Sequence, residues 1–167
     1  MRQFEKIMKF VRLPWKEKGH LMEALYLSGI IRFAILFFPF RKVASIMGKQ
    51  MTESPPQASM EAYKKALTVR RAVEKVSRFT PWESKCLVQA LSALIMLKRR
   101  KVLGTLYLGI TKDGSDKLLA HAWLRCGEMT VTGGREQGMF KAVAYFSSQP
   151  RGKVQKRKDA DGDGSAC

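Results

Sequence analysis

The stretch TPWESKCLVQALSALIMLKRR, residues 80–100, decides how the chain is organised. It opens with a capping box, in which the Thr80 hydroxyl accepts from the backbone N–H of Glu83 and Pro81 occupies the first helical position, where no donor is needed. We therefore expect a helix that begins at Thr80 and carries Cys86 in its second turn. The residues after Cys86 are apolar on almost every side, and a helix of that kind lies at the centre of a fold.

Cys86 and His121 form the candidate reactive pair. His121 lies 35 positions after Cys86, in the run AHAWLRCG, and is one of two histidines in the chain. A thiol near a helix N-terminus and an imidazole on a following strand are the groups that a cysteine nucleophile needs, because the base favours the thiolate. The alternative is structural, since cysteine is often buried as a small apolar residue and a strand histidine is often a hydrogen-bonded core residue.

Alternation along the predicted strand 117–126 separates two faces. His121 shares one face with Trp123, and Ala120 and Ala122 lie on the other. The small residues suit close packing on the central helix if their face is the inner one, whereas the catalytic interpretation places the His121 face inside. The sequence leaves both arrangements open.

The periodicity of the chain predicts an α+β fold. Helical patterns come first, including an amphipathic helix at 60–78, and the spacing then changes to the alternation of strands. The expected strands are 102–111, 117–126, 128–132 and 139–146. Helices followed by strands predict a central Cys-bearing helix packed on an antiparallel sheet.

Composition divides the chain into four segments. We expect an N-terminal helical segment at 1–50, a linker at 51–59 that contains Pro55 and Pro56, and a core at 60–148. The tail, 149–167, is poor in hydrophobic residues and rich in charge and glycine, so we expect it to be disordered.

The cysteine usage argues against disulfides and metal. Cys86, Cys126 and Cys167 are odd in number and widely spaced, and two histidines are too few for a zinc site. We therefore expect no cofactor and a cytoplasmic location.

The net charge of +17 suggests an acidic partner. The basic residues are scattered and accompany no nucleic-acid-binding motif, so acidic peptides, acidic proteins or anionic lipid fit at least as well as nucleic acid. Residues 21–40 are apolar but interrupted by Glu23, Arg32 and Pro39, which leaves runs too short for a membrane span. We interpret this stretch as a buried helix, with peripheral contact at the inner membrane face as the alternative.

Four motifs together resemble a known family. TPWESKCLVQAL, LYLGIT, AHAWLRCG and VTGG, in this order, look like the transglutaminase-like cysteine peptidase of lasso-peptide maturation, in the form where the leader peptidase is a separate chain. The stretch EALYLSGIIRFAILFFPFRKVASIMG, residues 23–48, is similar to the N-terminal region of that family. The resemblance runs from about residue 20 to 147.

The resemblance implies a papain-like peptidase. Cys86 would attack the scissile carbonyl of a precursor peptide, and His121 would take the thiol proton and later protonate the leaving amine. Cleavage would remove the leader and free the core amine, which a separate ATP-dependent cyclase joins to an acidic side chain to form a macrolactam. A transglutaminase-like acyl transferase, or a non-catalytic scaffold that binds acidic partners, are the alternative functions.

The chain departs from that family at the third catalytic position. The family has an aspartate about a dozen residues after the histidine, where this chain has Thr132 and Gly133. Orientation of His121 must come from Thr132, from a backbone carbonyl, or from a carboxylate such as Glu128 or Glu136. A Cys-His dyad is workable, because the third residue mainly fixes the tautomer and the ring.

The first 60 residues lack the strand pairs that the family's leader-binding domain needs. We therefore expect a separate leader-recognition protein to present the precursor peptide to this chain.

Overall fold

The structure is a computed structural model that describes residues 14–80 and 85–148. The predictions for the tail and for Pro81 and Glu83 lie outside the described residues. The helices are α2 (Trp15–Phe37), α3 (Phe40–Met47), α4 (Met60–Ser77), α5 (Cys86–Arg99) and the short 3-10 helix η1 (Gln137–Met139). The strands are β1 (Lys49–Gln50), β2 (Thr105–Lys112), β3 (Leu118–Cys126), β4 (Met129–Thr132) and β5 (Lys141–Ser147).

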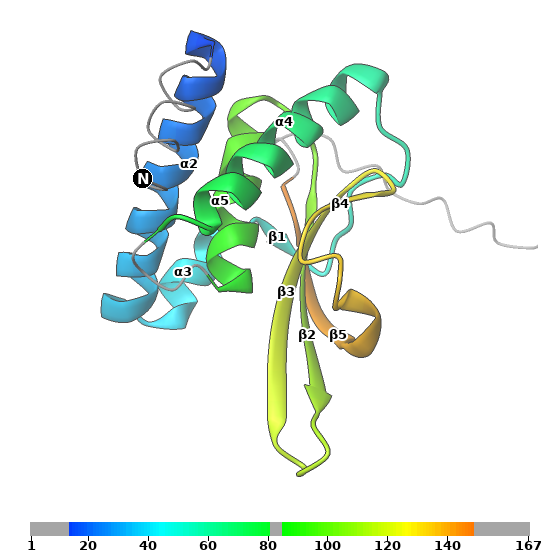
Figure 1. The fold of residues 1–167 in the computed structure, drawn as a ribbon. Coiled ribbons are helices and arrows are strands. Elements are labelled where there is room, and N and C mark those ends of the chain that lie inside the picture. Colours follow the sequence, from blue (N-terminus) through cyan, green and yellow to red (C-terminus); the bar gives the residue numbers. More distant parts are fainter. Residues whose placement is uncertain (1–13, 81–84, 149–167) are drawn as a thin grey trace, which may run out of the picture.

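The strands form one antiparallel sheet in the order β1-β5-β2-β3-β4. The four α-helices lie together on one side of it, and the far end of the β2–β3 hairpin projects beyond them (Figure 1). The predicted α+β class is confirmed, as are the helix at 60–78 and the four predicted strands, to within a few residues at each end.

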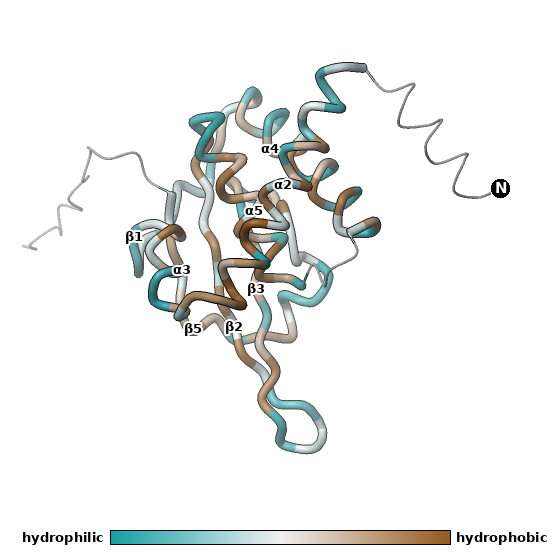
Figure 2. The backbone as a smooth tube through the Cα atoms, turned by 90° about the vertical axis from the view of Figure 1, so that its left-hand side faces the viewer, coloured by the Kyte–Doolittle hydropathy of each residue, from teal (hydrophilic) through white to brown (hydrophobic). Residues whose placement is uncertain are grey.

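Helix α5 lies at the centre of the core. Its side chains at Val88, Leu91, Leu94 and Leu97 are at most 1% exposed. They pack in one cluster with residues of α2, α4 and the sheet, and α5 is among the most hydrophobic parts of the chain (Figure 2). Each such side chain contributes about 1.5–3 kcal/mol when it is buried, so the position of α5 is fixed by apolar cover on all sides.

The predicted start of this helix was wrong. Helix α5 begins at Cys86, six residues after Thr80, with Lys85 in extended conformation as its N-cap. Thr80 lies instead in the turn that follows α4, where its backbone N–H donates to the Val76 carbonyl at 3.1 Å. Cys86 is therefore the first residue of the helix, rather than a residue of its second turn.

The segment between α3 and α4 is tied to the sheet. Gly48, with φ of +118°, ends α3 and leads into β1, a strand that the sequence did not predict and that pairs with β5. The predicted linker then follows the sheet: the buried Ser54 donates its backbone N–H to the Thr105 hydroxyl at 2.7 Å. The linker is thus held against the start of β2.

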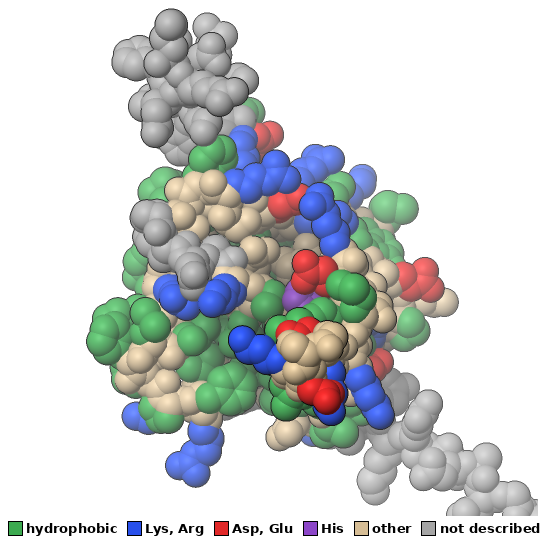
Figure 3. Space-filling model, turned by 60° about the horizontal axis from the view of Figure 1, so that its bottom comes forward, with side chains coloured by type: hydrophobic (Ala, Val, Ile, Leu, Met, Phe, Trp, Pro, Cys, Tyr) green, Lys and Arg blue, Asp and Glu red, His purple; other side chains and the backbone are tan. Residues whose placement is uncertain are grey.

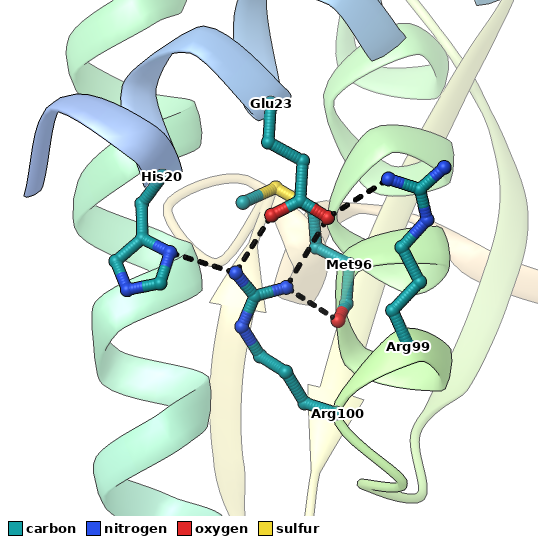
Figure 4. A network of polar contacts seen from close by, with 5 residues as sticks. All are labelled: His20, Glu23, Met96, Arg99 and Arg100. Atoms are coloured by element: carbon teal, nitrogen blue, oxygen red, sulfur yellow. Dashed lines mark hydrogen bonds and ion pairs between the residues drawn. The ribbon is translucent and has the colours of Figure 1, made fainter. Parts of the chain in front are cut away.

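A charged network joins α2 to the C-terminal end of α5 (Figure 4). The Glu23 carboxylate accepts from Arg100 at 2.7 Å and from Arg99 at 3.2 Å, and Arg100 also bonds to His20 Nδ1 at 2.8 Å and to the Met96 carbonyl at 2.9 Å. Burial alone would raise the pKa of Glu23, but the hydrogen bonds and charges of the two arginines outweigh it and hold that pKa below its usual range.

We predict that Glu23→Gln lowers the free energy of unfolding at pH 7 by about 1–2 kcal/mol. Because the pKa of Glu23 is lower in the folded state, its contribution is complete above the unfolded pKa and is lost as pH falls through the folded pKa. Urea denaturation of both proteins between pH 7 and pH 3 checks this. A difference that stays constant over that range would show that Glu23 ionisation contributes nothing.

Candidate active site

Cys86 is a free, half-buried cysteine at the first position of α5. The N–H groups of a first helical turn have no partner within the helix, and the helix dipole is strongest there. Both favour negative charge on the Cys86 sulfur and on an oxyanion formed beside it. A helix that began at Thr80, as predicted, would have placed the thiol in the second turn, where this effect fades.

His121 lies in β3 opposite Gly109 of β2, and its side chain is 8% exposed. Strand β4 ends at Thr132, opposite Leu124, so β3 is the edge of the sheet at His121. Ala122 and Leu124 belong to the core that contains α5. The small-residue face is therefore the inner one, and the imidazole reaches the site from the other face at an open edge.

An aromatic layer supports the imidazole. The His121 ring lies 4.9 Å from the Phe140 ring and 6.0 Å from the Trp123 ring, and Trp123 stacks on Tyr107 at 5.4 Å. A Cβ at Gly109 would come within 2.7 Å of the Trp123 ring. Glycine at this position is what allows Trp123 to lie flat beside the histidine.

The hydrogen bonds of His121 define its tautomer. Nε2 lies 2.9 Å from the Gly133 carbonyl oxygen. A carbonyl only accepts, so Nε2 donates and carries the proton, and Nδ1 keeps its lone pair in the neutral ring. Nδ1 lies 3.7 Å from the Glu136 carboxylate, with which it forms an ion pair only when the ring is protonated. The backbone of Gly133 thus holds the ring in the form of a base at Nδ1.

The proposed orienting residues differ in their positions. Thr132 is buried and lines the same cleft, but its hydroxyl has no hydrogen-bond partner among the described residues, and the bond expected from it is made by Gly133. Glu128 is exposed at the β3–β4 turn, where its backbone N–H bonds to Tyr63. Glu136 is the carboxylate that reaches the ring.

Cys86 and His121 line one cleft with a volume of about 860 Å³. Figure 3 shows a histidine side chain set back in a hollow of this surface, with acidic, basic and hydrophobic side chains around it. The charged residues of the cleft are Arg70, Glu74, Arg78, Lys85, Arg135 and Glu136. Cations outnumber carboxylates, so the cleft carries a positive charge that attracts negatively charged groups.

Among the hydrogen bonds of the described residues, none joins the Cys86 thiol to the His121 imidazole. Each side chain faces the shared cleft, and Nδ1 faces Glu136. Catalytic hydrogen bonds are often long in the absence of substrate and shorten when it binds. The arrangement places a thiol at a helix N-terminus and an imidazole with a defined hydrogen bond on the wall of the same cleft.

Comparison with known protein families assigns most of the chain to one superfamily. Residues 34–144 match the family model of the transglutaminase-like superfamily. The chain belongs to this superfamily, which includes cysteine peptidases and acyl transferases. Neither the search of curated proteins nor that of solved structures gave a match.

Several residues of the site were missed from the sequence. Phe140 and Arg135 come from the loop after β4, and Arg70 and Arg78 come from α4. No motif marks them, because a loop and a neighbouring helix bring them to the cleft. The Gly133-Gly134 pair was the available signal, since Gly133 adopts a φ of +73°.

We predict that Gly133→Ala disturbs the histidine and Gly138→Ala does not. A Cβ at Gly133 would lie 2.6 Å from the Ala122 carbonyl and 3.0 Å from His121 Nε2, whereas nothing lies within 4 Å of one at Gly138. We expect Gly133→Ala to lower the free energy of unfolding by about 1–3 kcal/mol and to shift the His121 ring resonances in NMR spectra. Equal behaviour of the two variants would contradict the role given to the Gly133 carbonyl.

Proposed function

We propose that this chain is a cysteine peptidase that removes the leader from a lasso-peptide precursor and so frees the core amine for a separate cyclase. One observation carries the proposal: Cys86, at the first residue of α5, and His121, with its lone pair on Nδ1, line the same cleft of a transglutaminase-like domain. The four sequence motifs that resemble the leader peptidase support the choice of substrate.

Acylation of Cys86 is the first chemical step of the proposed reaction. His121 Nδ1 takes the thiol proton, and the sulfur attacks the carbonyl carbon at the end of the leader, so that a C–S bond forms. The first-turn N–H groups of α5 stabilise the oxyanion. The C–N bond then breaks, and the imidazolium returns the proton to the amine of the departing core.

Hydrolysis of the thioester completes the cycle. Water gives a proton to Nδ1 and attacks the leader thioester, and the C–S bond breaks. The imidazolium returns this proton to the Cys86 sulfur, and the leader acid releases its own proton to solvent and leaves as a carboxylate. In both steps the Gly133 carbonyl accepts a hydrogen bond from Nε2. The proton is therefore transferred by Nδ1, on the other side of the ring. This backbone bond takes the place of the acidic residue that the family uses.

The position and the charge of the cleft suit a peptide substrate that a second protein presents. It lies at the edge of the sheet, and its guanidinium and ammonium groups attract carboxylates of the precursor. The N-terminal part of the described chain is α2, α3 and the two-residue β1, without a sheet of its own for a leader strand. We therefore propose that a separate leader-recognition protein presents the precursor and that a macrolactam-forming cyclase uses the product.

An acyl transferase is the second candidate, because the superfamily includes that activity. It would form the thioester from a Gln or Asn side chain with release of ammonia, and an amine would then replace water. A non-catalytic scaffold would bind the precursor and leave its mass unchanged. Mass spectrometry of the precursor peptide separates the three outcomes.

We predict that Cys86→Ala and His121→Ala each abolish leader removal and keep the fold. His20→Ala and Cys126→Ala are the matched controls, because neither residue lines the cleft. The assay uses a lasso-precursor peptide, with a separate leader-recognition protein, and follows separate leader and core masses. Wild-type turnover by Cys86→Ala or His121→Ala would exclude the mechanism, and unchanged precursor with the wild-type chain would favour the scaffold.

We predict that Glu136→Gln reduces kcat only slightly, because the Gly133 carbonyl, rather than Glu136, holds Nε2. Loss of the acid in a full triad costs about four orders of magnitude in kcat. The exposed Glu128 supplies the control variant Glu128→Gln. A fall of that size in Glu136→Gln alone would identify Glu136 as the third catalytic residue.

A further inference from the structure

Helix α2 has an exposed apolar face that nothing in the described chain covers. Tyr26, Phe33 and Phe37 are 66%, 56% and 67% exposed, and they line up at helical spacing with further exposed residues. Those are Trp15, Met22, Ile30 and Leu36, and Phe38 and Phe40 follow after the helix. An apolar stripe of this size marks an interaction surface.

The opposite face of α2 is already used by the core. Leu21, Ala24, Leu27 and Ile31 are at most 9% exposed and pack with α4 and α5. Helix α2 is long and apolar enough to cross a membrane by length and composition alone. To do so, it would have to leave this packing and break the Glu23–Arg100 pair. The geometry therefore favours contact along the length of the helix over insertion across a bilayer.

The charges around the apolar stripe indicate what it contacts. Arg41 and Lys42 are exposed in α3, at the end of the stripe, and Lys42 lies 5.5 Å from the Phe38 ring. Within residues 14–50, the six cations outnumber the two acids, and one of these acids, Glu23, is bound by arginines. The cations are Lys16, Lys18, Arg32, Arg41, Lys42 and Lys49. A stripe of aromatic and aliphatic side chains with a basic end, on a segment with more cations than acids, suits an anionic surface.

We propose that α2 lies flat on an anionic lipid bilayer, with Tyr26, Phe33 and Phe37 in the interfacial region and Arg41 and Lys42 at the headgroups. Apolar burial and attraction to anionic lipid add in this binding mode. A second copy of the chain fits the face less well, because each copy carries a net charge of +17. The cleft lies on other elements of the fold, so the proposal does not depend on the peptidase reaction.

Vesicle flotation of the full chain tests the proposal. We expect binding to vesicles of phosphatidylcholine and phosphatidylglycerol at 7:3 to exceed binding to pure phosphatidylcholine by about tenfold or more, and to weaken at high salt. The triple variant Tyr26→Gln, Phe33→Gln, Phe37→Gln should lose this binding. The matched control Leu118→Gln, Met139→Gln, Val143→Gln, with exposed apolar residues elsewhere, should keep it.

A second pair of variants separates the local charge from the net charge. Arg41→Glu with Lys42→Glu should weaken binding by about tenfold, and Lys117→Glu with Lys141→Glu, which changes the net charge equally, should weaken it far less. Absence of vesicle binding, or equal binding by the two triple variants, would overturn the proposal. A dimer in sedimentation experiments without lipid, lost only in the Tyr26, Phe33, Phe37 variant, would assign the face to a second copy instead.

Discussion

The rest of the structure depends on the burial of α5. A helix whose side chains are apolar all round is stable only when every face is covered, and here the sheet, α2 and α4 together provide that cover. The cover fixes where the helix lies. Its first residue, Cys86, lines the cleft together with residues of β3 and β4, so the packing of α5 also positions the thiol.

The position of the histidine depends on an interaction of the backbone. Strand β4 ends at Thr132, and Gly133 turns its carbonyl toward His121 Nε2 in a conformation that favours glycine. A carbonyl accepts without ionising, so it defines the neutral tautomer but adds no negative charge to stabilise an imidazolium. Glu136 lies 3.7 Å from Nδ1, but its side chain is 59% exposed, so solvent screens its charge. The position of the ring is therefore determined mainly by the backbone, rather than by a carboxylate.

Much of the fold could be predicted from local patterns, and the failures have physical causes. The alternation in 117–126 and the spacing in 60–78 are local signals, and both elements formed as expected. The prediction that the helix starts at Thr80 was wrong because the residues of a capping motif can also close a preceding helix. Here the Thr80 backbone N–H bonds back to the Val76 carbonyl of α4. Strand β1 is two residues long and depends wholly on its partner β5, so no local period marks it. In the site, Cys86 and His121 were predicted from their chemistry, and both line the cleft, whereas the cleft residues of α4 and of the loop after β4 depend on tertiary contacts.

The most direct test of the central claim, that Cys86 performs acyl transfer in this cleft, is the intact mass of the protein during turnover. The full chain is mixed with precursor and leader-recognition protein and quenched in acid, and its mass is measured without digestion. The proposal predicts that the wild-type chain gains the mass of the leader minus water, and that Cys86→Ala gains nothing. An adduct of the whole precursor minus ammonia, or cleavage that proceeds with no adduct and survives in Cys86→Ala, would contradict it.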